Sequence, residues 1–109
     1  MARDKLVEER VEALLPGDHQ LERKSMFGGM AFLDRGNLCF GVSAAHLLVR
    51  VGEEGSEEAL QRPGARLMVM RDRPMMGWVQ VDPLGYESDN DLKWWLEKGI
   101  TFAATLPAK

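Results

Sequence analysis

Residues 25–51, SMFGGMAFLDRGNLCFGVSAAHLLVRV, decide the fold, because three short apolar runs alternate there with polar or small connections. The runs are 30–33, 38–42 and 47–51, and the connections between them are 34–37 and 43–46. Apolar runs of this length, bounded by turn residues, are typical of strands joined by tight hairpins. We therefore expect a β-meander at the centre of the chain.

The segments outward from this meander alternate between helix and strand patterns. Residues 3–15 predict an amphipathic helix that ends before Pro16 and Gly17, with an apolar stripe of Leu6, Val7, Val11, Leu14 and Leu15 facing the sheet. Residues 20–24 are polar and are suited to an edge strand, whose charges discourage pairing with another sheet.

The second half of the chain predicts a short helix, two strands and a long helix. Ser56 is expected to cap a helix over 57–61. Residues 66–70 and 78–81 predict strands, with 71–77 as their connection. A capping box at 88–91 precedes the last helix, whose apolar stripe is Leu92, Trp95, Leu96, Ile100, Ala103 and Leu106. Together these segments predict one α+β domain over 1–109, with five to six strands.

Composition excludes several classes of protein. The net charge of −3 is not the basic excess of a dedicated nucleic-acid binder. Cys39 is the single cysteine, so no intrachain disulfide is possible, and we expect a buried, reduced thiol. No stretch has the pattern of a secretory signal or a membrane span, so we expect a cytoplasmic protein.

Catalytic and metal-binding patterns are absent from the sequence. His19 and His46 have no ligand-type partner at helical spacing, and no serine lies in a nucleophile elbow. Acidic residues 53–58 are typical of a solvated helix start. The sequence therefore predicts no enzyme, no metal and no cofactor.

Arginines and methionines near residue 70 suggest a binding surface. Arg62, Arg66, Arg71 and Arg73 fall within twelve residues and are opposed only by Asp72. They suit an acidic partner or a phosphate backbone, or they form an ordinary solvated face. Met75 and Met76 are expected at the surface in a turn, while Met68 or Met70 fills the core.

Trp94 points away from the apolar stripe of the last helix at about 100° per residue. An exposed tryptophan is typical of an interface, and packing beneath a loop is the alternative. We expect a partner surface formed by Arg71, Arg73, Met75, Met76 and Trp94.

Two glycines in Met26-Phe27-Gly28-Gly29 precede the first run of the meander. Glycines there suggest positive φ, a bulge or close backbone approach. A phosphate-binding loop is the competing interpretation, but such a loop leads into a helix, and here a strand pattern follows.

The chain resembles the N-terminal domain of the TfoX/Sxy family, bacterial regulators of competence for DNA transformation. The resemblance rests on RKSMFGGMAF, LCFGV, LLVRVGEE, RDRPMMGWVQV and the Leu-Lys-Trp-Trp core of the last helix, in that order. It implies a two-layer sandwich similar to the secretion-chaperone-like fold, with a curved antiparallel sheet and terminal helices. We expect a stand-alone version that lacks the family's second, helical domain.

The resemblance also implies a non-enzymatic role in regulation, since full-length regulators act with the cyclic-AMP receptor protein at competence promoters. The leading hypothesis is a protein-interaction module, with such a transcription factor or a second copy of the chain as partner. A nucleic-acid-associated regulator that uses the arginines of 62–73 is the second hypothesis. An enzyme or small-ligand binder is the third, and it requires a deep pocket with titratable groups.

Overall fold

The computed structural model describes residues 5–15, 21–26, 29–43 and 46–108. Its elements, in chain order, are α1 (Lys5–Leu14), β1 (Glu22–Met26), β2 (Gly29–Asp34), β3 (Asn37–Val42), β4 (Leu47–Arg50), α2 (Gly52–Leu60), β5 (Ala65–Met70), β6 (Arg73–Val81), the 3-10 turn η1 (Pro83–Tyr86) and α3 (Asp89–Ala104).

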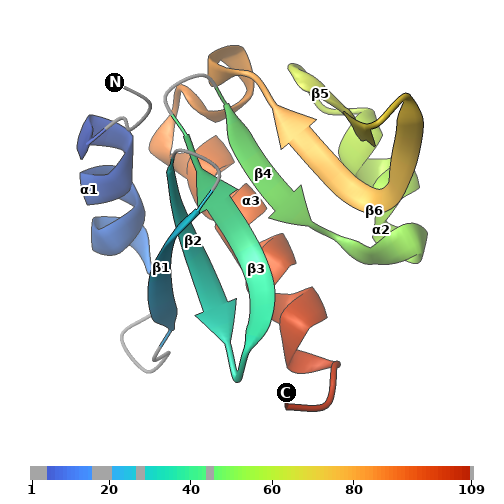
Figure 1. Cartoon of the computed structure of the whole chain (residues 1–109). Coiled ribbons are helices and arrows are strands. Elements are labelled where there is room, and N and C mark those ends of the chain that lie inside the picture. The colour runs from blue at the N-terminus through green and yellow to red at the C-terminus, as the bar shows by residue number, and fades with distance from the viewer. Residues whose placement is uncertain (1–4, 16–20, 27–28, 44–45, 109) are drawn as a thin grey trace.

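The six strands form one antiparallel sheet in the order β1-β2-β3-β4-β6-β5. Figure 1 shows α3 behind the middle of the sheet, α2 behind β6, and α1 beside β1, so the other face of the sheet carries no helix. The predicted α+β class, with helices at both ends of an antiparallel sheet, is confirmed. No helix in the described ranges is long and apolar enough to cross a membrane.

The hydrophobic core lies between α3 and the central strands. Trp95 and Leu92 of α3 are fully buried, as are Phe32 and Phe40 of β2 and β3, whose rings stack 4.9 Å apart. Gly99 lets α3 approach the sheet, because a Cβ there would lie 2.4 Å from the carbonyl oxygen of Cys39. The predicted stripe of the last helix is thus the buried one, except that Leu106 lies beyond the end of α3 and is only half-buried.

The N-terminal helix buries a narrower stripe than predicted. Val7 and Val11 are buried, and Leu14 and Leu15 pack partly against the core. Leu6, which was expected to face the sheet, is 74% exposed. The prediction for Leu6 is wrong because α1 lies at the side of the molecule and packs on α3, so it has only a narrow buried face.

The last two strands differ most from the prediction. The strand β6 begins at Arg73, and the connection from β5 is only the turn Arg71-Asp72, in which both residues have positive φ, 52° and 65°. Met75 and Met76 therefore lie in a strand and not in a turn. The register with β5 shifts between Leu67 and Met68, which leaves Met76, Gly77 and Trp78 as extra residues on β6.

The short helix also begins earlier than expected. Gly52, with φ of +80°, leads directly from β4 into α2. Ser56 is consequently inside the helix, and its predicted role as N-cap is wrong. Its buried hydroxyl donates to the Gly52 carbonyl at 2.9 Å and accepts from the Gly77 N–H at 3.2 Å, so it ties α2 to the bulge of β6.

Ser88 caps the long helix as predicted, although the Asp91 carboxylate of the expected capping box pairs with Arg62 instead. The Ser88 side chain accepts a hydrogen bond from the Asp91 N–H at 3.1 Å. This bond satisfies one of the backbone N–H groups that every helix start leaves unpaired.

Candidate interaction surface

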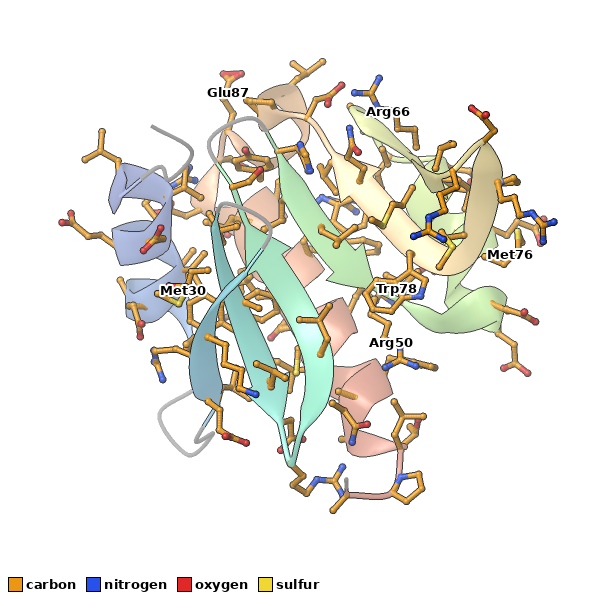
Figure 2. All side chains as sticks on the ribbon, viewed as in Figure 1. Met30, Arg50, Arg66, Met76, Trp78 and Glu87 are labelled. Atoms are coloured by element: carbon orange, nitrogen blue, oxygen red, sulfur yellow. The ribbon has the colours of Figure 1, made fainter. Side chains whose placement is uncertain are left out.

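The β5–β6 hairpin exposes apolar and basic side chains together. We call Val69, Arg71, Arg73, Met75 and Met76 the hairpin surface. Val69 is 62% exposed and Met76 is 54% exposed, which places both among the most exposed large apolar residues of the described chain. Figure 2 shows Met76 pointing outward at the edge of the molecule. Four of the five residues predicted for the partner surface therefore lie on one element, and Met75 among them is half-buried.

The tight turn holds Arg71 and Arg73 at the tip of this surface. Two consecutive residues with positive φ are the geometry of a type I′ hairpin turn. That geometry usually takes glycine, asparagine or aspartate, so the arginine at its first position is conformationally unfavourable. In the described structure neither Arg71 nor Arg73 has a recorded ion pair, and both side chains are exposed.

The other two arginines of the cluster are neutralised by carboxylates. Arg62 pairs with Asp91 of α3 at 2.8 Å, and Arg66 pairs with Asp82 at 3.0 Å. The sequence suggested four cations opposed by one acid, but Asp82 and Asp91 reach this segment from later elements. Of these four arginines, only Arg71 and Arg73 make no salt bridge in the described structure.

Trp94 is separated from the hairpin surface. It lies on α3, where it is half-buried and packs edge-on against Trp95 with ring centroids 4.8 Å apart. The Arg62 guanidinium covers its ring at 4.0 Å, and the Lys98 ammonium lies 5.0 Å from it. Since Arg62 precedes β5 and the Arg71 turn follows it, Trp94 lies near the opposite end of that strand.

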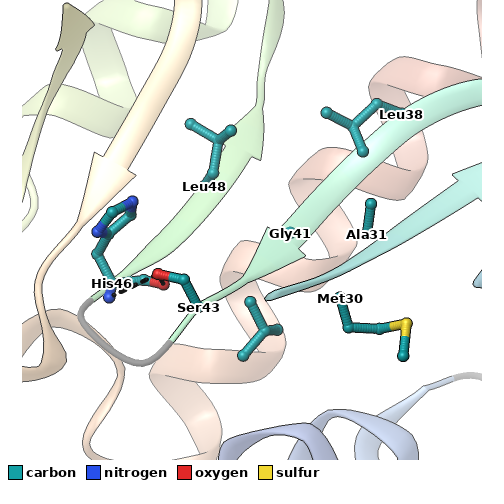
Figure 3. A pocket seen from close by; sticks show the side chains of 8 residues that line it. Met30, Ala31, Leu38, Gly41, Ser43, His46 and Leu48 are labelled. Carbon is teal, nitrogen blue, oxygen red and sulfur yellow. Dashed lines mark hydrogen bonds between the residues drawn. The ribbon is translucent and has the colours of Figure 1, made fainter. Parts of the chain in front are cut away.

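The helix-free face of the sheet has a shallow apolar hollow. Figure 3 shows Leu38, Gly41, Leu48 and His46 around it. Its volume is about 50 Å³, far below the several hundred Å³ typical of a small-molecule site. His46 is a turn residue, as expected, because its carbonyl accepts from the Ser43 N–H at 3.0 Å.

A wider groove of about 640 Å³ runs between the start of α2 and the end of α3. Glu53, Glu54, Lys98 and Phe102 are among its lining residues. Among the residues that the structure describes, the groups whose pKa is shifted are Glu12, Arg23, Cys39 and Glu58, and all four lie outside both hollows. Within the described ranges no three histidine, cysteine, aspartate or glutamate side chains gather as a metal site, and His19 lies outside those ranges.

Arg50 and Trp78 lie together beside the hairpin, as Figure 2 shows. The Arg50 guanidinium is 5.0 Å from the Trp78 ring and 5.4 Å from the Phe102 ring. Arg50 is therefore a cation held between two aromatic rings, and it links β4 and β6 to α3. The predicted strand run 47–51 includes Arg50, but the sequence gave no sign of these rings.

Cys39 is buried in the core, as predicted. Burial raises the pKa of its thiol to about 12, and the nearby Asp34 carboxylate adds to this shift. The reactive form of cysteine is the thiolate. Cys39 is consequently an inert packing residue and not a nucleophile.

The glycine pair of the meander has a packing role at Gly29. A Cβ at Gly29 would lie 2.0 Å from the carbonyl oxygen of Val42, so β2 and β3 approach each other too closely for any side chain there. This is the close backbone approach that the sequence suggested. Met26 ends β1, while Phe27 and Gly28 lie outside the described residues.

Comparison with protein families gives one result. Residues 13–103 match the family described as the TfoX N-terminal domain. Neither the curated proteins nor the solved structures contain a significant match.

Proposed function

The chain belongs to the TfoX N-terminal domain family, and from this membership we propose that it is a non-enzymatic protein-interaction module of bacterial regulation. The observation that carries the proposal is the hairpin surface, where exposed Val69 and Met76 lie on the same hairpin as two arginines without ion pairs. Methionine and arginine are enriched in protein interfaces, where apolar contacts are ringed by polar groups.

The proposed surface is smaller than the one the sequence suggested. Trp94 already contacts Trp95, Arg62 and Lys98, so removing it would disturb packing within the domain. We therefore assign partner binding to the hairpin surface without Trp94.

A protein partner is favoured over nucleic acid by the charges around β5. Carboxylates pair with Arg62 and Arg66, which leaves two cations of this cluster for a phosphate backbone, on a chain of net charge −3. Nucleic-acid binders depend on many such cations. Two arginines beside apolar side chains fit a protein surface better.

Titration of purified partners against matched variants tests the proposal. Candidates come from affinity capture in an extract of the producing bacterium, and the family resemblance supplies the cyclic-AMP receptor protein as the first to try. The test variant is Arg71→Gln/Arg73→Gln. The control is Lys24→Gln/Lys93→Gln, which removes the same charge from two exposed residues outside the hairpin.

We expect the test variant to weaken partner binding by about tenfold or more and the control to leave it unchanged, as for residues at the centre of an interface. Equal binding of the partner by the wild type, the test variant and the control variant would refute the proposed surface. Binding of duplex DNA that is lost with rising salt and with the arginines would support the nucleic-acid hypothesis instead.

A further inference from the structure

We propose that the outer edge of β5 binds an extended acidic segment of a partner protein, which pairs with it as a seventh strand. This inference rests on the proposed function, since it names how the hairpin surface engages its partner. Nothing in the described chain pairs with that edge, because β5 is the last strand in the sheet order.

The register shows which backbone groups of β5 point outward. Val69 is paired with Pro74, and proline has no N–H. In an antiparallel ladder a proline fits where the paired residues do not hydrogen-bond to each other, so the N–H and C=O of Val69 point away from β6. Hydrogen-bonding direction alternates along a strand, and Leu67 therefore points its backbone groups the same way.

The turn confirms this alternation independently. Met70 and Arg73 flank the two-residue turn. In such a hairpin the flanking residues form a hydrogen-bonded pair, which again places Val69 in the pair that faces outward. The edge thus offers free N–H and C=O groups at Leu67 and Val69, the arrangement that strand addition requires.

The other edge of the sheet is protected. The strand β1 has exposed Glu22, Arg23 and Lys24 along its short length, and charges of this kind discourage pairing. Arg23 is also held by Glu12 of α1. By contrast, Leu67, Met68 and Val69 are consecutive apolar residues in β5, an edge that natural proteins seldom leave open without a partner.

The charges favour an acidic segment over a second copy of the chain. Arg71 and Arg73, which make no salt bridge in the described structure, lie at the end of β5, whereas Arg66 near its start is paired with Asp82. A second copy would bring its own residues 65–71 to this edge, a segment with two arginines and no carboxylate, so it would not complement Arg71 and Arg73 as an acidic segment would. The chain's own fold also carries exposed glutamates on α2. They are on a helix that packs against β6 from the helix side of the sheet, and not on a strand that could pair with β5.

The test uses a fluorescent peptide of about seven residues that alternates valine and glutamate, long enough to span β5. Its binding to the chain is followed by fluorescence anisotropy. We expect saturable binding, and binding weakened by about tenfold when alternate peptide nitrogens are methylated, because each methyl removes a backbone donor. A peptide of the same length that alternates valine and lysine should bind much more weakly than the glutamate peptide.

A pair of variants at one position separates backbone pairing from side-chain contact. Val69→Pro removes the outward N–H, while Val69→Thr keeps it and retains a β-branched side chain. We expect Val69→Pro to lose peptide binding by about tenfold or more and Val69→Thr to keep most of it. Circular dichroism checks that both variants fold, and the methylated peptide tests the same bond on the unaltered chain.

The outcomes distinguish this inference from the proposed function. If the arginine variant weakens a natural partner but Val69→Pro and Val69→Thr behave alike, the interface exists without strand addition, and the inference fails. Absence of glutamate-peptide binding, or equal binding of the methylated peptide, also overturns it. A dimer that Val69→Pro disrupts, with no peptide binding, would assign the edge to a second copy of this chain.

Discussion

At the scale of single residues, Ser56 connects two elements through one hydroxyl. It bonds to the Gly52 carbonyl and the Gly77 N–H in a buried site, and Gly77 itself has a φ of +90°. Ser56→Ala would leave the Gly77 N–H without its partner. We expect a loss of about 1–3 kcal/mol in the free energy of unfolding, measured by urea denaturation.

Ser88→Ala is the comparison for this prediction. It removes an exposed cap that accepts from the Asp91 N–H. We expect it to lower the free energy of unfolding by about 1 kcal/mol, because water can replace an exposed cap. If Ser56→Ala proves no more destabilising than Ser88→Ala, the link between α2 and the β6 bulge is not important for stability.

Because of Cys39, the unfolding free energy of the domain should fall at alkaline pH. Its pKa rises from an ordinary value of 9.0 to about 12 in the folded chain because of burial. The folded state therefore holds this proton more tightly than the unfolded state does. The resulting stability is complete below about pH 9 and is lost as pH rises above it.

Comparison with Cys39→Ala isolates this effect from other alkaline titrations. Between about pH 8 and pH 10 we expect the unfolding free energy of the wild-type chain to fall more steeply than that of the variant. A thiol reagent should label the wild-type chain only after denaturation. Rapid labelling of the folded chain would show that the thiol is accessible and that the prediction is wrong.

At the scale of elements, the turn of the β5–β6 hairpin has a sequence that lowers the unfolding free energy but supplies a positive charge at Arg71. Arg71 and Asp72 both have positive φ, which glycine and asparagine adopt at lower energy. Replacing Arg71-Asp72 by Asn-Gly should raise the unfolding free energy by about 1 kcal/mol. The same change should weaken binding of the glutamate peptide, since it removes one of the two unpaired arginines.

Thermal unfolding and peptide titration of the one variant measure both effects. A variant that is more stable and binds as well as the wild type would show that Arg71 has no role in binding. A less stable variant would show that the turn is not of the type that we assign.

The stabilisation that the contact between α1 and β1 provides should be lost at acidic pH. The Arg23 guanidinium hydrogen-bonds the Glu12 carboxylate and lowers its pKa, and the pair is partly exposed. A carboxylate whose folded pKa is lowered stabilises the fold above its unfolded pKa, and this stability disappears as pH falls through the folded value. Because solvent screens the pair, its contribution is at most about 1 kcal/mol.

Glu12→Gln tests this contact. We expect the variant to be slightly less stable than the wild type near neutral pH, with the two unfolding free energies converging below about pH 4. Denaturation curves at several pH values measure the difference. A constant difference at all pH values would assign the effect to packing and not to charge.

At the scale of the whole molecule, the sequence predicted elements with regular periodicity and missed those with special backbone geometry. The strands β2 to β4 and the buried stripe of α3 follow from apolar spacing alone. The first half of β6 looked like a loop because of Pro74 and Gly77. Pro74 occupies a position that needs no N–H, and Gly77 occupies the bulge.

The sequence likewise predicted only part of the candidate surface. Arg71, Arg73, Met75 and Met76 are near neighbours in sequence, so a hairpin brings them together. Arg62 covers the ring of Trp94. Arg62 also pairs with Asp91, and Arg66 pairs with Asp82. Contacts between residues far apart in the chain have no signal in a local pattern.

The position of β5 at the end of the sheet order implies a distinct pattern of amide deuterium exchange. Amides of Arg66 and Met68, which face β6, should exchange slowly, while those of Leu67 and Val69 should exchange at nearly the rate of a free peptide. Saturation with the glutamate peptide should slow Leu67 and Val69 and leave the other two unchanged. Uniform exchange along β5, with or without the peptide, would contradict the register argument directly.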